Sequence, residues 1–396
     1  MLNFSVLRRT TLLRSQRVLA AFLLFIALAV AASLDAQQNS ASPSSASSAT
    51  PPVLDPEITS YNAYLLKPAT AVRTPYHDDQ ETPPPPEERT AKNALNGAIM
   101  YYYLKSVPSN PLTLEIHDAQ GQVVRRFNSL TPAADPTSKN HLSKDAGLNR
   151  FVWDLRYEAP QVLNFTYSGG PQDHMEHSVS GDAPPAGTPR DQLLGPLVVP
   201  GQYEVFFIGN GMVMKQPLTI TLDPRIHVSQ ADLEAQLVAL KRIGSGLAAS
   251  AKAFHSIVNL RAAIADRLKT LGTAAANPQV KGSAEALNEL DKKAADILEG
   301  TSEAPGLGPV NRDLAHTSFL IQSDDAAPSQ TAQAALEKSC TQLNKNLTTW
   351  RGLDSQSVPA TNTIIAKSAL AALPTATVMS ITSVSHDAAT ADACAP

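Results

Sequence analysis

The chain has 396 residues, of which 43% are hydrophobic, so its length and composition allow two domains of ordinary size, each with its own core. Only 17% of the residues are charged, and the formal net charge of -4 is spread without long runs of one sign. A nucleic-acid partner requires a concentrated basic face, so this charge pattern argues against one.

The N-terminus has the order of a secretory signal peptide. Several arginines, the last of them Arg17, precede an apolar run from Val18 to Ala32, and small residues surround the end of that run. We therefore expect residues 1–33 to be a signal peptide and the mature protein to be periplasmic or secreted. The alternative is a single membrane anchor, because the run is nearly long enough to span a bilayer. Contact with a membrane would then be made only through an uncleaved signal segment.

Two stretches next in the chain lack the pattern of a folded core. Residues 34–60 are rich in Ser, Ala and Pro, and such a composition cannot bury enough surface to become ordered, so we predict a disordered tether. The run "TPPPPEERT", Thr82 to Thr90, is a stiff polyproline stretch with solvated charges. We expect residues 61–95, which contain it, to form an extended arm that docks on a neighbouring domain.

Residues 96–226 have the period of β-strands. In "LTLEIHD", three aliphatic residues alternate with polar ones, which puts Leu112, Leu114 and Ile116 on one side of a strand. Further strands with Gly and Pro turns follow. The region is predicted to be an immunoglobulin-like antiparallel β-sandwich.

The stretch "RFVWDLRYE", residues 150–158, combines aromatic and charged residues and raises the question of an active site. Alternation predicts that three residues face the core: Phe151, Trp153 and Leu155. It predicts that three charged residues face outward: Arg150, Asp154 and Arg156. Arg156 would hold Asp154 ionised, which makes that carboxylate a poor general acid, so we predict a core strand with charges on its outer face.

The period changes to that of helices at Ser229. "SQAD" is a capping box in which Ser229 accepts from first-turn amides and Asp232 is favoured by the helix dipole. Leucines then recur at helical spacing through a long first helix. Further helices are predicted from Ser283 to Gly300, Pro309 to Ser323, Gln330 to Leu353 and Thr361 to Leu373. We therefore predict an antiparallel helical bundle over residues 227–373, a flexible tail over residues 374–396, and an α+β, multi-domain chain.

The chain contains two cysteines, Cys340 and Cys394. They could pair in an oxidising compartment, but Cys340 occupies an apolar helix position and Cys394 lies near the end of the chain. The expected state is one buried thiol and one loose thiol.

One cluster, "QDHMEH", has the residue types of a metal site. Two histidines three residues apart can share a helical face, so His174, His177 and Asp173 are the candidate ligands. The flanks are loop formers and no HExxH spacing is present, which favours a polar insertion between strands instead. No cofactor is expected.

No pattern in the chain marks a catalytic residue. There is no GxSxG elbow, and neither cysteine has a histidine nearby in sequence. "GSG" at residues 244–246 lies inside the first helix, where it allows close helix contact or a kink rather than a phosphate loop. Asn346-Leu347-Thr348 matches a glycosylation sequon.

Several stretches together resemble one family: "NGAIMYYYLK", "LTLEIHDAQGQVVRRF", "AGLNRFVWDLRYE", "GPLVVPGQYEV" and "QPLTITLDPRIHVSQADL". They are similar to the C-terminal, post-propeller region of secreted bacterial BNR-repeat, sialidase-like or sortilin-like β-propeller proteins. The resemblance covers roughly Tyr64 to Leu373. It implies hook-cap-type immunoglobulin-like strands that follow a propeller. Here the expected signal peptide and tether lead almost directly into "AYLLKPATAVR", so we expect the chain to lack the propeller, and no catalytic residue can be carried over.

These patterns lead to two hypotheses about function. The first is an exported, non-catalytic binding or scaffold module with a protein or glycan partner, which could be a separately encoded propeller. The second is an accessory or degenerate part of a secreted glycoside hydrolase or peptidase system.

Overall fold

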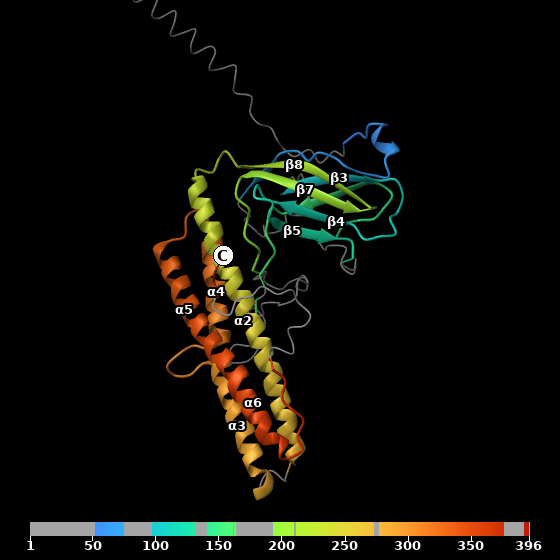
Figure 1. The fold of residues 1–396 in the computed structure, drawn as a ribbon. Coiled ribbons are helices and arrows are strands. Elements are labelled where there is room, and N and C mark those ends of the chain that lie inside the picture. Colours follow the sequence, from blue (N-terminus) through green and yellow to red (C-terminus); the bar gives the residue numbers. More distant parts are fainter. Residues whose placement is uncertain are drawn as a thin grey trace, which may run out of the picture. The chain divides into compact units, whose positions relative to one another are not determined.

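The computed structural model describes residues 52–74, 97–130, 141–160, 162–163, 193–209, 211–272, 277–375 and 392–395. In these residues the strands come first in the chain and the long helices follow (Figure 1). The prediction of an α+β chain is therefore confirmed. The expected signal peptide and most of the tether lie outside the described residues.

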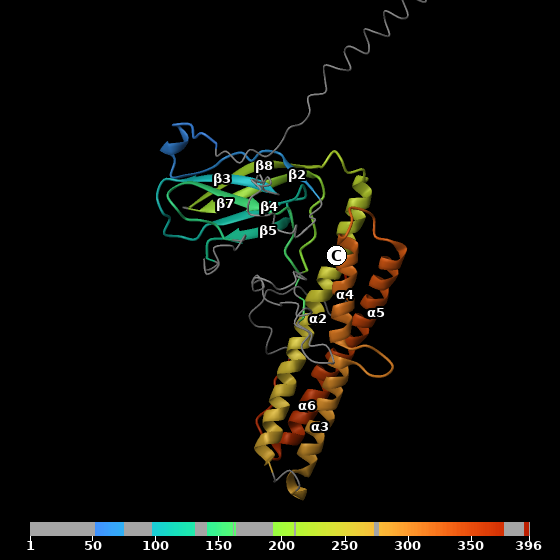
Figure 2. The same cartoon turned by 180° about the vertical axis from the view of Figure 1, so that it is seen from behind.

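The described strands form two sheets. The first sheet has the order β1-β3-β6, with β1 at Ala63–Leu65, β3 at Ala98–Leu104 and β6 at Gly147–Trp153. The second has the order β2-β8-β7-β4-β5, with β2 at Ala71–Arg73, β8 at Met212–Leu222, β7 at Gly201–Gly209, β4 at Thr113–His117 and β5 at Val123–Asn128. Neighbouring strands are antiparallel except β2, which runs parallel to β8; Figure 2 labels both.

The two sheets share one hydrophobic core. In β3 every second residue is buried, as an alternating strand requires. Trp153 is 1% exposed, and its indole N–H donates a hydrogen bond to the carbonyl of Arg156 at 2.9 Å. Phe151 and Leu155 are also buried, so the predicted inward face of this stretch is confirmed.

The predicted outward face of the same stretch is only partly correct. Arg150 and Asp154 are exposed as predicted, but Arg156 is only 8% exposed. The reason lies in the backbone: β6 ends at Trp153, and Leu155 has a φ of 59°, a left-handed conformation that interrupts the alternation. The prediction that Arg156 belongs to an outer charged face is therefore wrong.

Residues from the predicted arm take part in both sheets. β1 is paired with β3, and β2 is paired with β8. The side-chain amide of Gln216 in β8 also donates to the carbonyl of Leu65 in β1 at 3.0 Å, which connects the two sheets. Residues 63–73 are thus an integral part of the sheet region, which we define as β1 to β8.

The helical region consists of α2 at Gln230–Leu271, α3 at Pro278–Glu299, α4 at Leu307–Gln322, α5 at Gln330–Gly352 and α6 at Val358–Ala366. A π-helical turn, η3 at Leu353–Ser357, joins α5 to α6 without a break. The backbone N–H of Asp232 donates to the Ser229 hydroxyl at 3.1 Å, so the predicted cap of α2 is confirmed. Buried residues of all these helices form one core.

The end of the last helix differs from the prediction. α6 stops at Ala366, and Ala369 has a left-handed φ of 55°. The side chain of Asn362 then exchanges two hydrogen bonds with the backbone of Leu373, at 2.7 and 3.1 Å. These bonds hold the chain in a turn, so Leu373 is buried without belonging to the helix. In the part of the chain that the structure describes, no helix is long and apolar enough to span a bilayer.

The predicted state of the cysteines is wrong. Cys340 in α5 and Cys394 form a disulfide, and Cys394 is 0% exposed. The tail expected over residues 374–396 is therefore attached to the helices at residues 392–395. Gly246 in α2 makes this possible, because its missing side chain leaves room for the Cys394 sulfur.

Candidate functional site: a buried polar junction between the sheets and the helices

The metal ligands predicted from the sequence, Asp173, His174 and His177, lie outside the described residues. Within the described ranges, no group of three or more His, Cys, Asp or Glu side chains could hold a metal ion. The site that the structure does describe is built from other residues.

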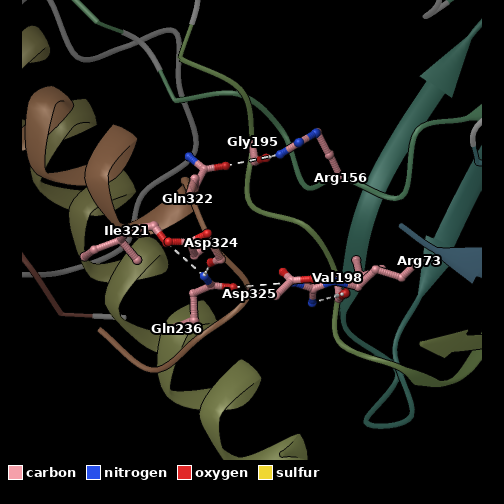
Figure 3. Close-up of polar contacts among 9 residues, drawn as sticks. All are labelled: Arg73, Arg156, Gly195, Val198, Gln236, Ile321, Gln322, Asp324 and Asp325. Carbon is pink, nitrogen blue, oxygen red and sulfur yellow. Dashed lines mark hydrogen bonds and ion pairs between the residues drawn. The ribbon is translucent and has the colours of Figure 1, made fainter. Parts of the chain in front are cut away.

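Arg73 is the centre of a buried polar junction between the sheets and the helices (Figure 3). It is the last residue of β2 and its side chain is 1% exposed. One guanidinium nitrogen donates to the carbonyl of Val198 at 2.9 Å, and the other forms an ion pair with Asp325 and donates to Gln236 at 3.4 Å. A cation from the edge of a sheet is thus neutralised by a carboxylate that follows α4.

Gln236 extends the junction from α2 to the C-terminal end of α4. Its side-chain amide donates to the carbonyls of Ile321 at 2.8 Å and Asp324 at 2.6 Å. The last carbonyls of a helix lack partners within the helix, so this amide satisfies groups that would otherwise be buried without one. Arg73, Gln236 and Asp325 therefore bring three distant parts of the chain together, as Figure 3 shows.

Arg156 makes a second connection next to the first. Its guanidinium donates to the carbonyl of Gly195 at 2.8 Å and to the side chain of Gln322 in α4 at 3.1 Å. Gln322 in turn donates to the carbonyl of Leu194 at 3.2 Å. A Cβ at Gly195 would lie 2.0 Å from the carbonyl oxygen of Tyr157, so only glycine fits here. The left-handed turn at Leu155 is what directs Arg156 to this place.

The ion pair of Arg73 and Asp325 has a structural role in the junction. A buried ion pair stabilises little in itself, but removal of one partner leaves an uncompensated buried charge. Arg73 Nε and Asp325 Oδ2 are buried and have no hydrogen-bond partner among the described residues. A variant that removes either Arg73 or Asp325 should therefore lower the free energy of unfolding, because it leaves the other charge buried without its partner.

A pocket of about 260 Å³ lies beside the junction. Its lining is mainly apolar and includes Pro160, Pro196 and Leu240 of α2. The ammonium of Lys241 lies 4.7 Å from the ring centre of Tyr157, which also lines the pocket. Burial, with a smaller effect from the charge of Asp118, raises the pKa of Tyr157 to about 12. Apolar walls with a few polar groups suit binding.

The two glycines of "GSG" have different surroundings. A Cβ at Gly244 would meet nothing within 4 Å, and this residue lines the pocket. A Cβ at Gly246 would lie 2.9 Å from the Cys394 sulfur and 3.1 Å from Leu314. The predicted close contact is therefore found at Gly246.

The outer face of the five-stranded sheet carries a row of paired charges. Glu115 accepts hydrogen bonds from His117 at 2.9 Å and from Arg126 at 2.7 Å. Burial alone would raise the pKa of Glu115, but the hydrogen bonds and charges of His117 and Arg126 together lower it. The ring of Phe206 lies 4.4 Å from that of His117 and 5.5 Å from the Lys215 ammonium. Glu115 and His117 are half-buried, and the groups of this cluster satisfy one another.

The sequon at Asn346 is not available for modification in this fold. Asn346 is buried in α5 and donates a hydrogen bond to the carbonyl of Pro305 at 3.0 Å. An attached glycan would have to displace this contact, so the match to the sequon is structural coincidence.

Sequence reasoning missed both arginines of the junction. Arg73 lies in a strand of three residues, too short for a period-two pattern, and Arg156 follows the break at Leu155. A basic residue that ends an otherwise apolar stretch is the one signal that could have marked Arg73. Comparisons of the chain with protein-family models, with curated proteins and with solved structures give no match.

Proposed function

We propose that this chain is an exported, non-catalytic binding or scaffold module, with an immunoglobulin-like sandwich followed by an antiparallel helical bundle. The observation that carries the proposal is the buried junction of Arg73, Gln236 and Asp325. It couples the sheets to the helices through side chains that are almost completely buried. Such coupling suits a protein that presents one composite surface to a partner.

Export is supported by the disulfide between Cys340 and Cys394. Disulfides form and persist in oxidising compartments and are rare in the cytosol. Together with the signal-peptide pattern of residues 1–33, this favours a periplasmic or secreted protein. N-terminal sequencing of the exported protein tests this: we expect it to begin at or near Leu34, and an intact Met1 on the exported protein would reject cleavage.

Binding is supported by the pocket beside the junction, because the sheet region and α2 both line it. By the resemblance to post-propeller regions, the partner we propose is a separately encoded β-propeller protein. An apolar side chain of that partner would fit between Pro160, Pro196 and Leu240.

The test is a pull-down from periplasmic extract with the tagged full chain. Gly244→Phe would fill the pocket, since a side chain at Gly244 points into open space. The matched control is Val238→Phe, at an exposed position of the same helix. We expect a propeller protein to be recovered with the wild type and with Val238→Phe but not with Gly244→Phe. Failure of the wild type to recover a propeller protein would reject the proposed partner, and equal recovery with Gly244→Phe would reject the pocket.

The alternative function is an accessory or degenerate part of a secreted glycoside hydrolase or peptidase system. It rests on the metal-ligand residue types of Asp173, His174 and His177 in the sequence. Elemental analysis of the purified protein, with and without His174→Ala, tests it. Stoichiometric metal that is lost in the variant would favour this alternative, and its absence from the wild type would remove the metal site.

A further inference from the structure

We propose that residues 392–395 form a C-terminal plug that the helices recognise through polar contacts with its backbone and with the Asp392 carboxylate, and that oxidation of Cys340 and Cys394 then fixes it covalently. The plug is a conformational device that completes the helical core after export. This inference rests on the export part of the proposed function and is independent of any partner.

The plug fits a notch in the helical core. Its floor is Gly246 of α2, where an added Cβ would lie 2.9 Å from the Cys394 sulfur, 3.1 Å from Leu314 and 3.4 Å from Leu343. Cys394 belongs to the same core as these leucines. Real Cβ atoms rarely approach other atoms this closely, so glycine at position 246 is the condition for seating the plug.

The helices also bind the plug through polar contacts that do not require the disulfide. The side chain of Asn344 in α5 donates to the Asp392 carboxylate at 2.7 Å and accepts from the backbone N–H of Ala393 at 3.0 Å. Arg242 in α2 donates to the carbonyl of Cys394 at 3.2 Å and pairs with Glu337. α2 and α5 therefore hold the plug from two sides and bring the two thiols together.

The covalent step is an ordinary thiol–disulfide exchange. A disulfide oxidant such as oxidised glutathione accepts two electrons, Cys340 and Cys394 each lose a proton, and two molecules of reduced glutathione are released. The product disulfide is buried, since Cys340 is 3% and Cys394 is 0% exposed. A thiolate must reach a sulfur atom to reverse the reaction, so the seated plug shields its own disulfide from reductants.

The experiment measures the equilibrium between dithiol and disulfide in glutathione buffers. The full chain is equilibrated at fixed ratios of reduced to oxidised glutathione, thiols are trapped by alkylation, and the oxidised fraction is read by mass spectrometry. Gly246→Ala is compared with Gly244→Ala, which adds the same methyl group to the same helix in open space. We expect Gly246→Ala to lower the equilibrium constant by about tenfold relative to Gly244→Ala, because overpacking opposes the seated plug. Equal equilibrium constants for the two variants would contradict the proposal that the missing side chain at Gly246 makes room for the plug.

A second variant keeps the test decisive if Gly246→Ala does not fold. Asn344→Ala removes both contacts to residues 392 and 393 from a partly exposed position, and Lys345→Ala is its exposed neighbour and control. We expect Asn344→Ala to lower the constant about fivefold and Lys345→Ala to leave it unchanged. An unchanged equilibrium constant for Asn344→Ala would contradict the proposal that polar contacts with the helices seat the plug. A protein found only in the cytosol would instead contradict export while leaving these constants as measured.

Discussion

The sheet region and the helical region bury their cores in different ways. The sheets enclose large aromatic side chains: the rings of Tyr102 and Phe207 lie 4.8 Å apart, and Trp153 is fully buried in the same core. The helical core consists mostly of Leu, Ile and Ala, and at Gly246 it has room only because a side chain is missing. The sheets should therefore be most sensitive to loss of volume, and the helices to added volume or a lost cross-link.

The largest effect is expected in the sheets. Trp153→Ala should lower the free energy of unfolding by about 3–5 kcal/mol, because it leaves a large cavity and removes the hydrogen bond to the Arg156 carbonyl. Chemical denaturation measures it. Arg150→Ala, on the exposed face of the same strand, should change stability by less than about 0.5 kcal/mol. A transition midpoint unaltered by the tryptophan variant would show that this core is not the main source of stability.

The junction should respond almost as strongly. Arg73→Met keeps the length of the side chain but leaves Asp325 buried without its cation, which should cost about 3 kcal/mol. Arg126→Met is the matched control, since the Arg126 side chain is 62% exposed and its pairing with Glu115 should contribute under about 1 kcal/mol.

The double variant Arg73→Met with Asp325→Leu separates the lost charge pair from lost packing. It should recover much of the stability, because a buried pair can be replaced by apolar groups. Suppose instead that the double variant loses as much free energy of unfolding as Arg73→Met and Asp325→Leu lose together. The loss in the single variants would then not come from an unpaired buried charge.

The disulfide should have a smaller effect, confined to the helices. Cys394→Ala opens a cross-link between residues 54 positions apart and should cost about 2–4 kcal/mol, mostly by freeing the unfolded chain. Hydrogen exchange should become faster in α2 and α5 and stay unchanged in β3 and β7. If hydrogen exchange became faster by the same factor in both regions, the two cores would unfold as one unit, and their stabilities could not be separated.

The smallest effect concerns the outer face of the sheet. The pKa of Glu115 is lowered in the folded protein, so its contribution is present above the usual value of 4.5 and is lost as the pH falls through the lowered pKa. Glu115→Gln should therefore be less stable than the wild type by under about 1 kcal/mol near neutral pH, and the two should converge in acid, below the lowered pKa of Glu115. Urea titrations at several pH values measure this; a constant difference at all pH values would contradict the assigned pairing.

The parts of the fold that depend on residues close together in the sequence could be predicted. Alternation placed Trp153 in the core, and the capping pattern placed the start of α2 at Ser229. The junction and the plug were not predictable, because Arg73 meets Asp325 and Cys340 meets Cys394 only through the tertiary fold. A single left-handed residue, Leu155, was enough to turn Arg156 from the predicted surface into the interior.

The parallel pairing of β2 with β8 has a practical consequence for dividing this protein into fragments. Residues 71–73 lie beside residues 220–222, directly before the chain enters α2. A fragment that starts after Thr74 would lose one edge strand of each sheet and, with Arg73, the cation that pairs with Asp325 after α4. The smallest fragment that retains both regions in their native form should therefore begin before Ala63.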